Sequence, residues 1–176
     1  NVYALNAGTG AELWRFTTGD KIRSSPKVSG NSVMIGSGDK NLYCLDAKTG
    51  ALLWQYATAG AIESTPNIDG GFVYVGSDDG NLYALSAAGG KPAWSFPTGG
   101  AVGSSPAIAG QVLYVGSYDH SLYALSNQPP VADFAGNRTT GITPLVVQFQ
   151  DQSTGSPTIW FWDFGDGETS TSQNPV

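Results

Sequence analysis

Short apolar runs separated by glycine-rich turns make up most of the chain. Within residues 74–94 an apolar run ends at a tight turn, Asp79-Gly80, continues into an alternating run centred on Tyr83, and breaks again at a pair of glycines. Asp-Gly between two apolar runs is typical of a β-hairpin, and alternation with a period of two is typical of a strand. The pattern therefore predicts short antiparallel strands joined by tight turns.

This unit recurs every 40 residues over the first part of the chain. A period of about 40–45 residues with four strands per unit is the signature of β-propeller blades. The pattern predicts two strands near 1–5 and 12–17, a first full blade near 23–28, 32–37, 41–46 and 52–57, a second near 63–68, 72–77, 81–86 and 92–97, and a third that begins near 103–108, 112–117 and 121–126. The residues that keep the step include Trp14, Trp54 and Trp94; Tyr3, Tyr43, Tyr83 and Tyr123; Leu5, Leu45, Leu85 and Leu125; Gly36, Gly76 and Gly116; and Asp39, Asp79 and Asp119.

Each strand has an expected place in its blade. The first strand carries Ser-Ser-Pro or Ser-Thr-Pro, ending at Pro26, Pro66 or Pro106. Proline cannot donate a ladder hydrogen bond, so we expect this strand at the inner edge. The tryptophan strand comes last and is expected at the outer edge, where the indole locks one blade against the next.

The repeat resembles that of the quinoprotein-like (PQQ-type) β-propellers. The tryptophan-docking motif of that family, AxxGxxxW, appears as Ala7–Trp14 and Ala47–Trp54, with Ala87–Trp94 as a looser copy. The resemblance covers residues 1–126. It implies an incomplete propeller, because about three blades are present and a closed ring needs about 4–8.

After residue 126 the repeat stops. Asn127-Gln-Pro-Pro is expected to be a stiff linker over 127–130. In residues 131–176, alternation around Phe149 and the run Trp160-Phe-Trp predict two strands of a β-sandwich. The run WDFGDG at 162–167 resembles the signature of PKD domains, an immunoglobulin-like sandwich, here truncated. Residues 131–136 are either the first strand of this sandwich, which we favour, or the outer strand of the third blade, because Phe134 lies 40 residues after Trp94.

Composition and charge limit the fold class and the kinds of binding partner. The 176 residues are 40% hydrophobic and only 12% charged, with 24 glycines and five tryptophans, which suits an all-β globular protein. A net charge of −6 argues against nucleic acid or an anionic membrane as partner, and no apolar run approaches the roughly 20 residues of a membrane span. The expected fold class is therefore all-β: an incomplete β-propeller of four-stranded blades followed by a partial immunoglobulin-like sandwich.

Several polar residues are candidates for chemistry, and for each we favour a structural role. The repeated aspartates Asp39, Asp79 and Asp119 are expected to stabilise their hairpin turns. Asp163 and Asp166 are better candidates for calcium binding than the repeated aspartates, because they place hard oxygen ligands close together. A structural role in the turn is favoured for them as well. We expect His120 to be a solvated turn residue, Cys44 a small packed residue, and Trp160 and Trp162 core residues, not a sugar-stacking platform.

No catalytic constellation is visible. The sequence lacks GxxxxGK[ST], HExxH and GxSxG, and it has one histidine and one cysteine. We therefore predict no catalytic residues. We also predict no PQQ binding, because about 4–8 blades are needed to enclose a channel and the adjacent-cysteine pair typical of the dehydrogenase family is impossible with Cys44 alone. Asn137-Arg-Thr is a sequon in a predicted loop and is a candidate glycosylation site.

The sequence thus predicts a non-catalytic scaffold that binds proteins or glycans, located outside the cytoplasm, at the cell surface or in the periplasm. The alternatives are a piece of a PQQ-dependent dehydrogenase or a propeller of the outer-membrane assembly type. Because Asn1 aligns with Asn41 inside a repeat, we expect the natural sequence to continue upstream with a secretory signal. Apolar residues such as Trp14, Tyr114 and Leu125 are expected to be partly exposed on the terminal blade faces, so that residues 1–176 self-associate or are only marginally stable.

Overall fold

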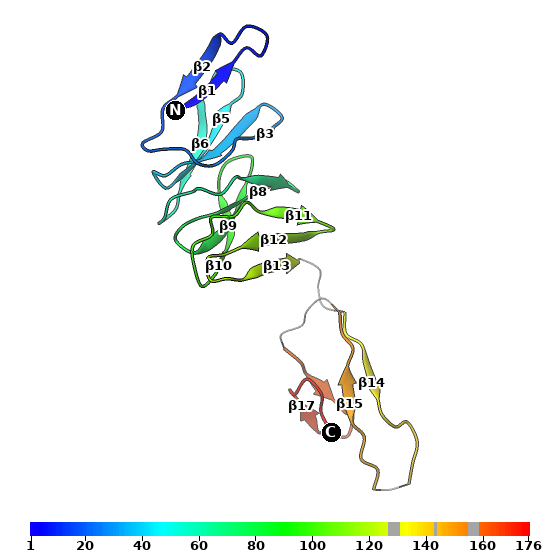
Figure 1. Ribbon diagram of the computed structural model, residues 1–176. Helices are drawn as coiled ribbons and strands as arrows, with labels where there is room; N and C mark the ends of the chain where they lie inside the picture. The colour runs from blue at the N-terminus through cyan, green and yellow to red at the C-terminus, as the bar shows by residue number, and fades with distance from the viewer. Residues whose placement is uncertain (127–130, 143, 155–158) are drawn as a thin grey trace. The chain divides into compact units, whose positions relative to one another are not determined.

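The computed structural model describes residues 1–126, 131–142, 144–154 and 159–176, which form strands and turns (Figure 1). The chain divides into two compact units, residues 1–125 and 126–176. Over the described ranges no helix has the length and apolar character needed to cross a membrane. The expected linker at 127–130 lies outside the described residues.

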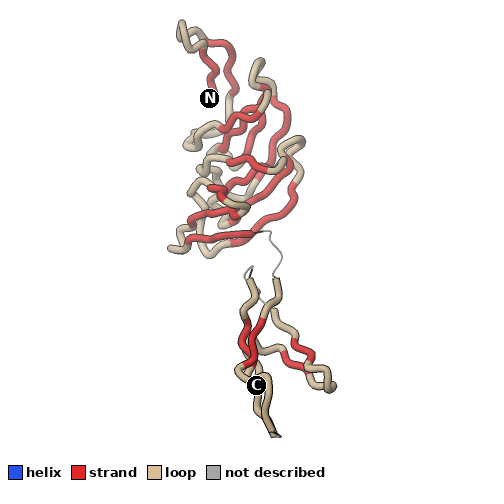
Figure 2. The backbone as a smooth tube through the Cα atoms, turned by 90° about the vertical axis from the view of Figure 1, so that its right-hand side faces the viewer, coloured by secondary structure: helices blue, strands red, loops and turns tan. Residues whose placement is uncertain are grey.

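Antiparallel sheets follow one another along the first unit, and Figure 2 shows the same succession from the side. Within each sheet the strands lie side by side in sequence order, as in a propeller blade. The sheets are β1 (Val2–Leu5) and β2 (Glu12–Phe16); β3 (Lys27–Ser29), β4 (Ser32–Gly36), β5 (Asn41–Asp46) and β6 (Leu52–Ala57); β7 (Asn67–Asp69), β8 (Phe72–Gly76), β9 (Asn81–Ser86) and β10 (Pro92–Pro97); and β11 (Ala107–Ala109), β12 (Val112–Gly116) and β13 (Leu122–Ser126).

The hydrophobic core of this unit lies between the sheets. Strand alternation sends one set of side chains toward the preceding sheet and the other toward the following sheet. Three clusters of buried residues result, one at each junction. The clusters contain Ile35, Tyr43 and Leu45 against β1–β2; Met34, Leu42 and Cys44 against Ile62, Val73, Val75 and Leu85; and Leu82 against Val102, Leu113 and Val115.

The prediction that the Ser-Pro segments are themselves strands was wrong. The inner strands β3, β7 and β11 begin only after Pro26, Pro66 and Pro106. In place of a backbone ladder, the hydroxyl of Ser24 accepts a hydrogen bond from Gly36 N and donates one to Gly36 O, both at 2.9 Å. The Ser24 side chain therefore satisfies the backbone groups at the end of β4, next to a proline that has no N–H to donate.

The described part of the last sheet in this unit has three strands, and its far face is open. Leu122 is 74% exposed, whereas its repeat equivalents Leu42 and Leu82 are fully buried. Tyr114 on this face is also exposed, as expected, while Leu125 packs in the junction below and is half-buried. On β13, Leu122 thus points to the open face of the sheet, whereas Leu125 points to the opposite face.

The second unit contains two small sheets. β14 (Phe134–Gly136) pairs with β15 (Phe149–Asp151), and β16 (Trp162–Asp163) pairs with β17 (Thr169–Ser170). Phe134 therefore belongs to the second unit, as favoured from the sequence. The strands are shorter than the apolar pattern predicted, because the β14–β15 pairing begins only at Phe149. Just before it, Gln148 N donates to the side-chain oxygen of Asn137 at 2.9 Å.

Candidate functional site

The repeated aspartates lie in the hairpin turns and also reach beyond them. Asp79 Oδ1 accepts hydrogen bonds from the backbone and side-chain nitrogens of Asn81, both at 3.0 Å. Its Oδ2 accepts from the hydroxyl of Tyr83 and from Ala59 N, both at 2.9 Å. Because Ala59 lies in the connection that arrives from the preceding sheet, the carboxylate ties that connection to the turn.

The other two copies repeat this arrangement. Asp39 Oδ2 accepts from Tyr43 Oη and Gly19 N, and Asp119 Oδ2 accepts from Tyr123 Oη and Gly99 N. Each aspartate thus serves its own junction, and the three do not converge on one site. The sequence predicted the turn role, but the bond to a residue 20 positions upstream needed the fold to become visible.

These bonds lower the pKa of the three carboxyl groups. At Asp119 the hydrogen bond from the Tyr123 hydroxyl is the largest cause, and together with hydrogen bonds from Gly99 and Ser121 it lowers the pKa to about 2. Burial alone would raise the pKa of Asp79, but hydrogen bonds from Asn81, Tyr83 and Ala59 outweigh it and lower the pKa. Burial and the same Asp79 carboxylate raise the pKa of Tyr83 to about 12.

We expect the protein to lose stability as the pH falls from about 4 to about 2. A depressed pKa means that the carboxylates stabilise the fold above the unfolded pKa, and this contribution is lost as each group is protonated through its folded pKa. The urea midpoint, followed by circular dichroism at several pH values, measures the loss. The plot of urea midpoint against pH should be flatter over this range for Asp79→Asn than for the control variant Asp69→Asn. Equal slopes in the two variants would contradict the role of Asp79.

The tryptophans of the outer strands dock on the next sheet. The indole N–H of Trp14 donates to Ala47 O at 3.0 Å, and that of Trp54 donates to Ala87 O at 3.1 Å. The rings lie against Gly50 and Gly90, where a Cβ atom would lie 2.6 and 2.5 Å from ring carbons. Trp94 differs, because 41% of it is exposed.

The repeated glycines at the ends of the second strands allow close approach of the next sheet. A Cβ on Gly36 would lie 2.3 Å from the side chain of Ile62, and one on Gly76 would lie 2.3 Å from Val102 O. Gly116 has room, since its nearest neighbour would be Ser104 Oγ at 3.5 Å. The first two glycines are therefore required for packing.

A ladder at the inner edge was not anticipated from the sequence. Ser25 N donates to Thr65 Oγ1 at 2.9 Å, and Thr65 N donates to Ser105 Oγ at 3.0 Å. Beside it, Arg23 and Glu63 form an ion pair at 2.6 Å. These partners lie 40 residues apart, so the repeat is the signal that could have found them.

The histidine and the cysteine occupy the structural positions expected of them. His120 is exposed in the β12–β13 turn with a φ of 71°. Cys44 is buried between sheets, and burial raises the pKa of its thiol.

Of the two calcium candidates, Asp163 ends β16 and Asp166 lies in the turn between β16 and β17. Asp163 Oδ1 accepts from Gly165 N and Asp166 Oδ1 accepts from Glu168 N, both at 2.9 Å. Among the described residues, no group of three or more acidic, histidine or cysteine side chains is arranged to hold a metal ion. Calcium binding here stays a prediction. So does glycosylation of Asn137, an exposed residue whose side-chain oxygen accepts from Gln148 N.

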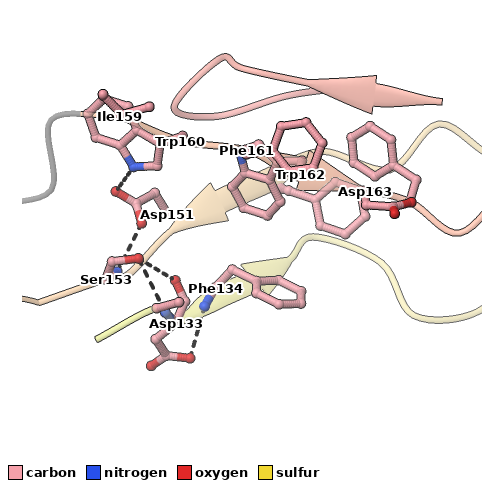
Figure 3. A pocket seen from close by; sticks show the side chains of 12 residues that line it. Asp133, Phe134, Asp151, Ser153, Ile159, Trp160, Phe161, Trp162 and Asp163 are labelled. Carbon is pink, nitrogen blue, oxygen red and sulfur yellow. Dashed lines mark hydrogen bonds between the residues drawn. The ribbon is translucent and has the colours of Figure 1, made fainter. Parts of the chain in front are cut away.

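The second unit contains an aromatic hollow of about 540 Å³ (Figure 3). Rings of Phe134, Phe149, Trp162 and Phe164 contact one another at centroid distances of 5.5–6.1 Å on one side of it. Phe161, which also lines the hollow, is 72% exposed. The two tryptophans are half-buried and alternate with exposed neighbours.

Polar groups fix the other side of this hollow. Asp151 Oδ2 accepts from the indole N–H of Trp160 at 2.9 Å, and its Oδ1 accepts from Ser153 N at 3.0 Å. Hydrogen bonds from Ser153 are the largest cause that lowers the pKa of Asp151 to about 2. Asp133 Oδ1 accepts from Phe134 N at 2.9 Å. Aromatic faces beside carboxylates suit a ligand with both apolar and hydroxyl surfaces.

Comparison with known families agrees with these features. Residues 1–128 match the family described as outer membrane protein assembly factor BamB, and residues 127–176 match the family described as PKD domain. None of the curated proteins matches significantly.

Two solved structures share the fold of the first unit. BamB from Moraxella catarrhalis is 30% identical, with a TM-score of 0.63 over 70% of this chain, which spans 39% of the length of that protein. The computationally designed Ika4 protein aligns with a TM-score of 0.60 over 67% of this chain and 74% of its own, at 16% identity, which shows the fold alone. The PQQ-type repeat and the PKD resemblance are thus confirmed, and the chain belongs to the family of the outer membrane protein assembly factor BamB, with an incomplete β-propeller followed by a PKD domain.

Proposed function

We propose that this chain is a non-catalytic scaffold that binds protein partners outside the cytoplasm. The observation that carries the proposal is the use of the repeated carboxylates: Asp39, Asp79 and Asp119 each bind a tyrosine hydroxyl and a backbone amide of their own junction. These three carboxylates therefore hold neighbouring blades together and are not free for acid, base or metal chemistry.

Membership in a family described as an outer membrane protein assembly factor indicates the class of partner. We propose that the partner is a polypeptide on its way to an outer membrane, and that the chain works in the periplasm or at the cell exterior. The PKD domain supports the same location, since such domains are typical of extracellular proteins. The chain requires no redox cofactor in this role.

The test is a binding titration with the whole chain. A fluorescently labelled, urea-unfolded outer-membrane β-barrel protein is diluted into increasing concentrations of the chain, and anisotropy is recorded. We expect saturable binding that an unfolded soluble protein of equal length does not show. Equal binding of both polypeptides would reject the proposed partner, and saturable binding of PQQ with calcium, together with dye reduction, would favour the dehydrogenase alternative.

The aromatic hollow favours a second candidate ligand, a glycan. Sugar rings present apolar CH faces that stack on aromatic side chains and hydroxyl groups that donate to carboxylates, and Phe161 and Asp133 offer both at the hollow. In the same titration, unlabelled oligosaccharides are added as a second ligand. Binding that Phe161→Ala abolishes would support this role, and no binding by any neutral or acidic oligosaccharide would remove it.

A further inference from the structure

The outer strands of the blades have an open backbone edge. Within the described residues β2, β6 and β10 each lie at the end of their sheet and pair with one neighbour. An edge strand presents N–H and C=O groups that have no strand partner, and proteins commonly protect such edges with proline or charge. All three strands carry a bulge at the equivalent place, so the bulge does not distinguish them.

Two of these edges are protected and the third is not. β10 begins with Pro92 and ends with Pro97. β2 contains Glu12 and Arg15, whose side chains form an ion pair at 2.8 Å. β6, with the sequence LLWQYA, has neither proline nor charge over its six residues. The edge of β6 is therefore open to pairing with another extended segment.

The ladder shows which backbone groups of β6 face outward. Thr58 N donates to Lys40 O at 2.9 Å, so the Thr58 N–H points toward β5. In an antiparallel pair, consecutive residues direct their backbone groups to opposite sides, so those of Gln55 and Ala57 point away from β5. Both residues are exposed. In β10 the equivalent of Ala57 is Pro97, which has no N–H to offer.

The side chains of β6 define which residues an added strand would need. Trp54 and Tyr56 are half-buried and pack toward the following sheet. Leu52 and Leu53, at the start of the strand, are 45% and 52% exposed. Apolar residues opposite aromatic or aliphatic side chains stabilise a strand pair. The partner that fits is therefore an extended segment with apolar residues at alternate positions.

Positive charge lies at both ends of β6. Lys48 is exposed in the β5–β6 turn, and Lys40, whose carbonyl accepts from Thr58 N, is exposed at the other end. Among the residues that the structure describes, neither lysine forms an ion pair. The carboxylates in the same turns, Asp39 and Asp46, are half-buried and accept backbone hydrogen bonds within those turns. The exposed lysines therefore complement acidic residues at the two ends of a bound segment.

We propose that the free edge of β6 binds an extended polypeptide segment as an added strand. The segment has apolar residues at alternate positions and carboxylates at both ends, beside Lys40 and Lys48. Its backbone groups pair with those of Gln55 and Ala57. The site rests on the proposed function, because it assigns the surface that holds the unfolded outer-membrane polypeptide.

The first test is a titration of a labelled peptide with the full 176-residue chain, followed by anisotropy. The peptide has valine alternating with threonine and is flanked by glutamates. We expect saturable binding that Ala57→Pro weakens at least about tenfold, because this variant copies Pro97 and removes an outward N–H. Ala57→Ser keeps the N–H and should bind within about twofold of the native chain. No binding to the native chain, or equal binding by the two variants, would overturn the proposal.

A second test alters the peptide and leaves the fold of the protein untouched. A strand at an edge uses alternate N–H groups only, so the peptide is N-methylated at either of its two alternate sets. Methylation of one set should weaken binding at least about tenfold, and methylation of the other should change it by less than about twofold. If both sets or neither weakened binding, the peptide would not be an added strand and the proposal would fail.

The charges at the ends are tested by reversal. The double variant Lys40→Glu, Lys48→Glu should weaken binding of the glutamate-flanked peptide at low salt, and should bind a lysine-flanked peptide more tightly than the native chain does. Unchanged preference between the two peptides would reject an acidic partner.

The unfolded outer-membrane protein, titrated in parallel, separates this site from the proposed function. If it bound Ala57→Pro as tightly as the native chain, the β6 site would be refuted while the proposed function stood. If the peptide bound at β6 but the outer-membrane protein bound no better than the unfolded soluble protein, the added-strand site would stand and the proposed partner would be rejected.

Discussion

Replacing Trp54 by alanine is expected to lower the free energy of unfolding by about 3–5 kcal/mol. The substitution removes the ring that lies against Gly90 and the indole N–H that donates to Ala87 O at 3.1 Å. It also leaves a cavity between two sheets that the rest of the junction cannot refill, because Met34 and Leu85 are held by their own strands. Urea denaturation followed by far-ultraviolet circular dichroism measures the change.

The same substitution at Trp94 provides the matched control. Trp94 occupies the equivalent strand position but is 41% exposed, so Trp94→Ala should cost about 1 kcal/mol or less at low protein concentration. If both alanine variants lost the same stability, docking on the next sheet would not be the source of the effect.

Replacing Gly76 by alanine is expected to destabilise the protein by about 2–3 kcal/mol. The new Cβ would lie 2.3 Å from Val102 O and 2.4 Å from Val102 Cγ1, and the carbonyl cannot move without breaking the bond from Val102 N to Ser77 O at 2.9 Å. The two sheets must therefore separate. Thermal and urea unfolding of the variant measure the loss.

Gly116 is the control for this experiment, because it is the same position one repeat later. A Cβ there would meet Ser104 Oγ at 3.5 Å, an ordinary contact. Gly116→Ala should therefore be neutral or slightly stabilising, since alanine restricts the unfolded chain more than glycine does. A large loss in Gly116→Ala would mean that backbone conformation, and not the approach of the next sheet, makes these glycines necessary.

The fold of the first unit was predictable because its information is repeated. Turn aspartates, alternating strands and tryptophans recur at a step of 40 and each predict the same blade, so an ambiguous copy is resolved by the others. The outer position of the tryptophan strand and the packed position of Cys44 followed from the same reasoning.

Contacts between segments far apart in the sequence could not be predicted from local patterns. The hydroxyl of Ser24 replaces a ladder bond at Gly36, 12 residues away, and Asp39 reaches Gly19, 20 residues upstream. Neither bond has a local signature, because serine and aspartate are also common in plain turns. The fold of one blade brings Ser24 to Gly36, and the stacking of two blades brings Asp39 to Gly19.

The second unit was predictable as a family and less so as a site. WDFGDG gave the PKD domain, but the alternating residues around Phe149 suggested a longer strand than the structure has. The hollow beside Trp162 is built from residues between 132 and 164, and such a long-range arrangement has no counterpart in a local pattern.

The aspartate that ties each turn to the incoming connection has an evolutionary consequence. Asp39, Asp79 and Asp119 each accept a hydrogen bond from the equivalent backbone N–H at their own junction. Each of these repeats therefore carries the same interblade hydrogen bond. Duplication of a 40-residue stretch of the gene would add a blade that fits both adjoining blades without further mutation, and loss of one would leave the flanking blades able to join. Blade number can therefore drift by whole units while the chemistry of the junction stays constant.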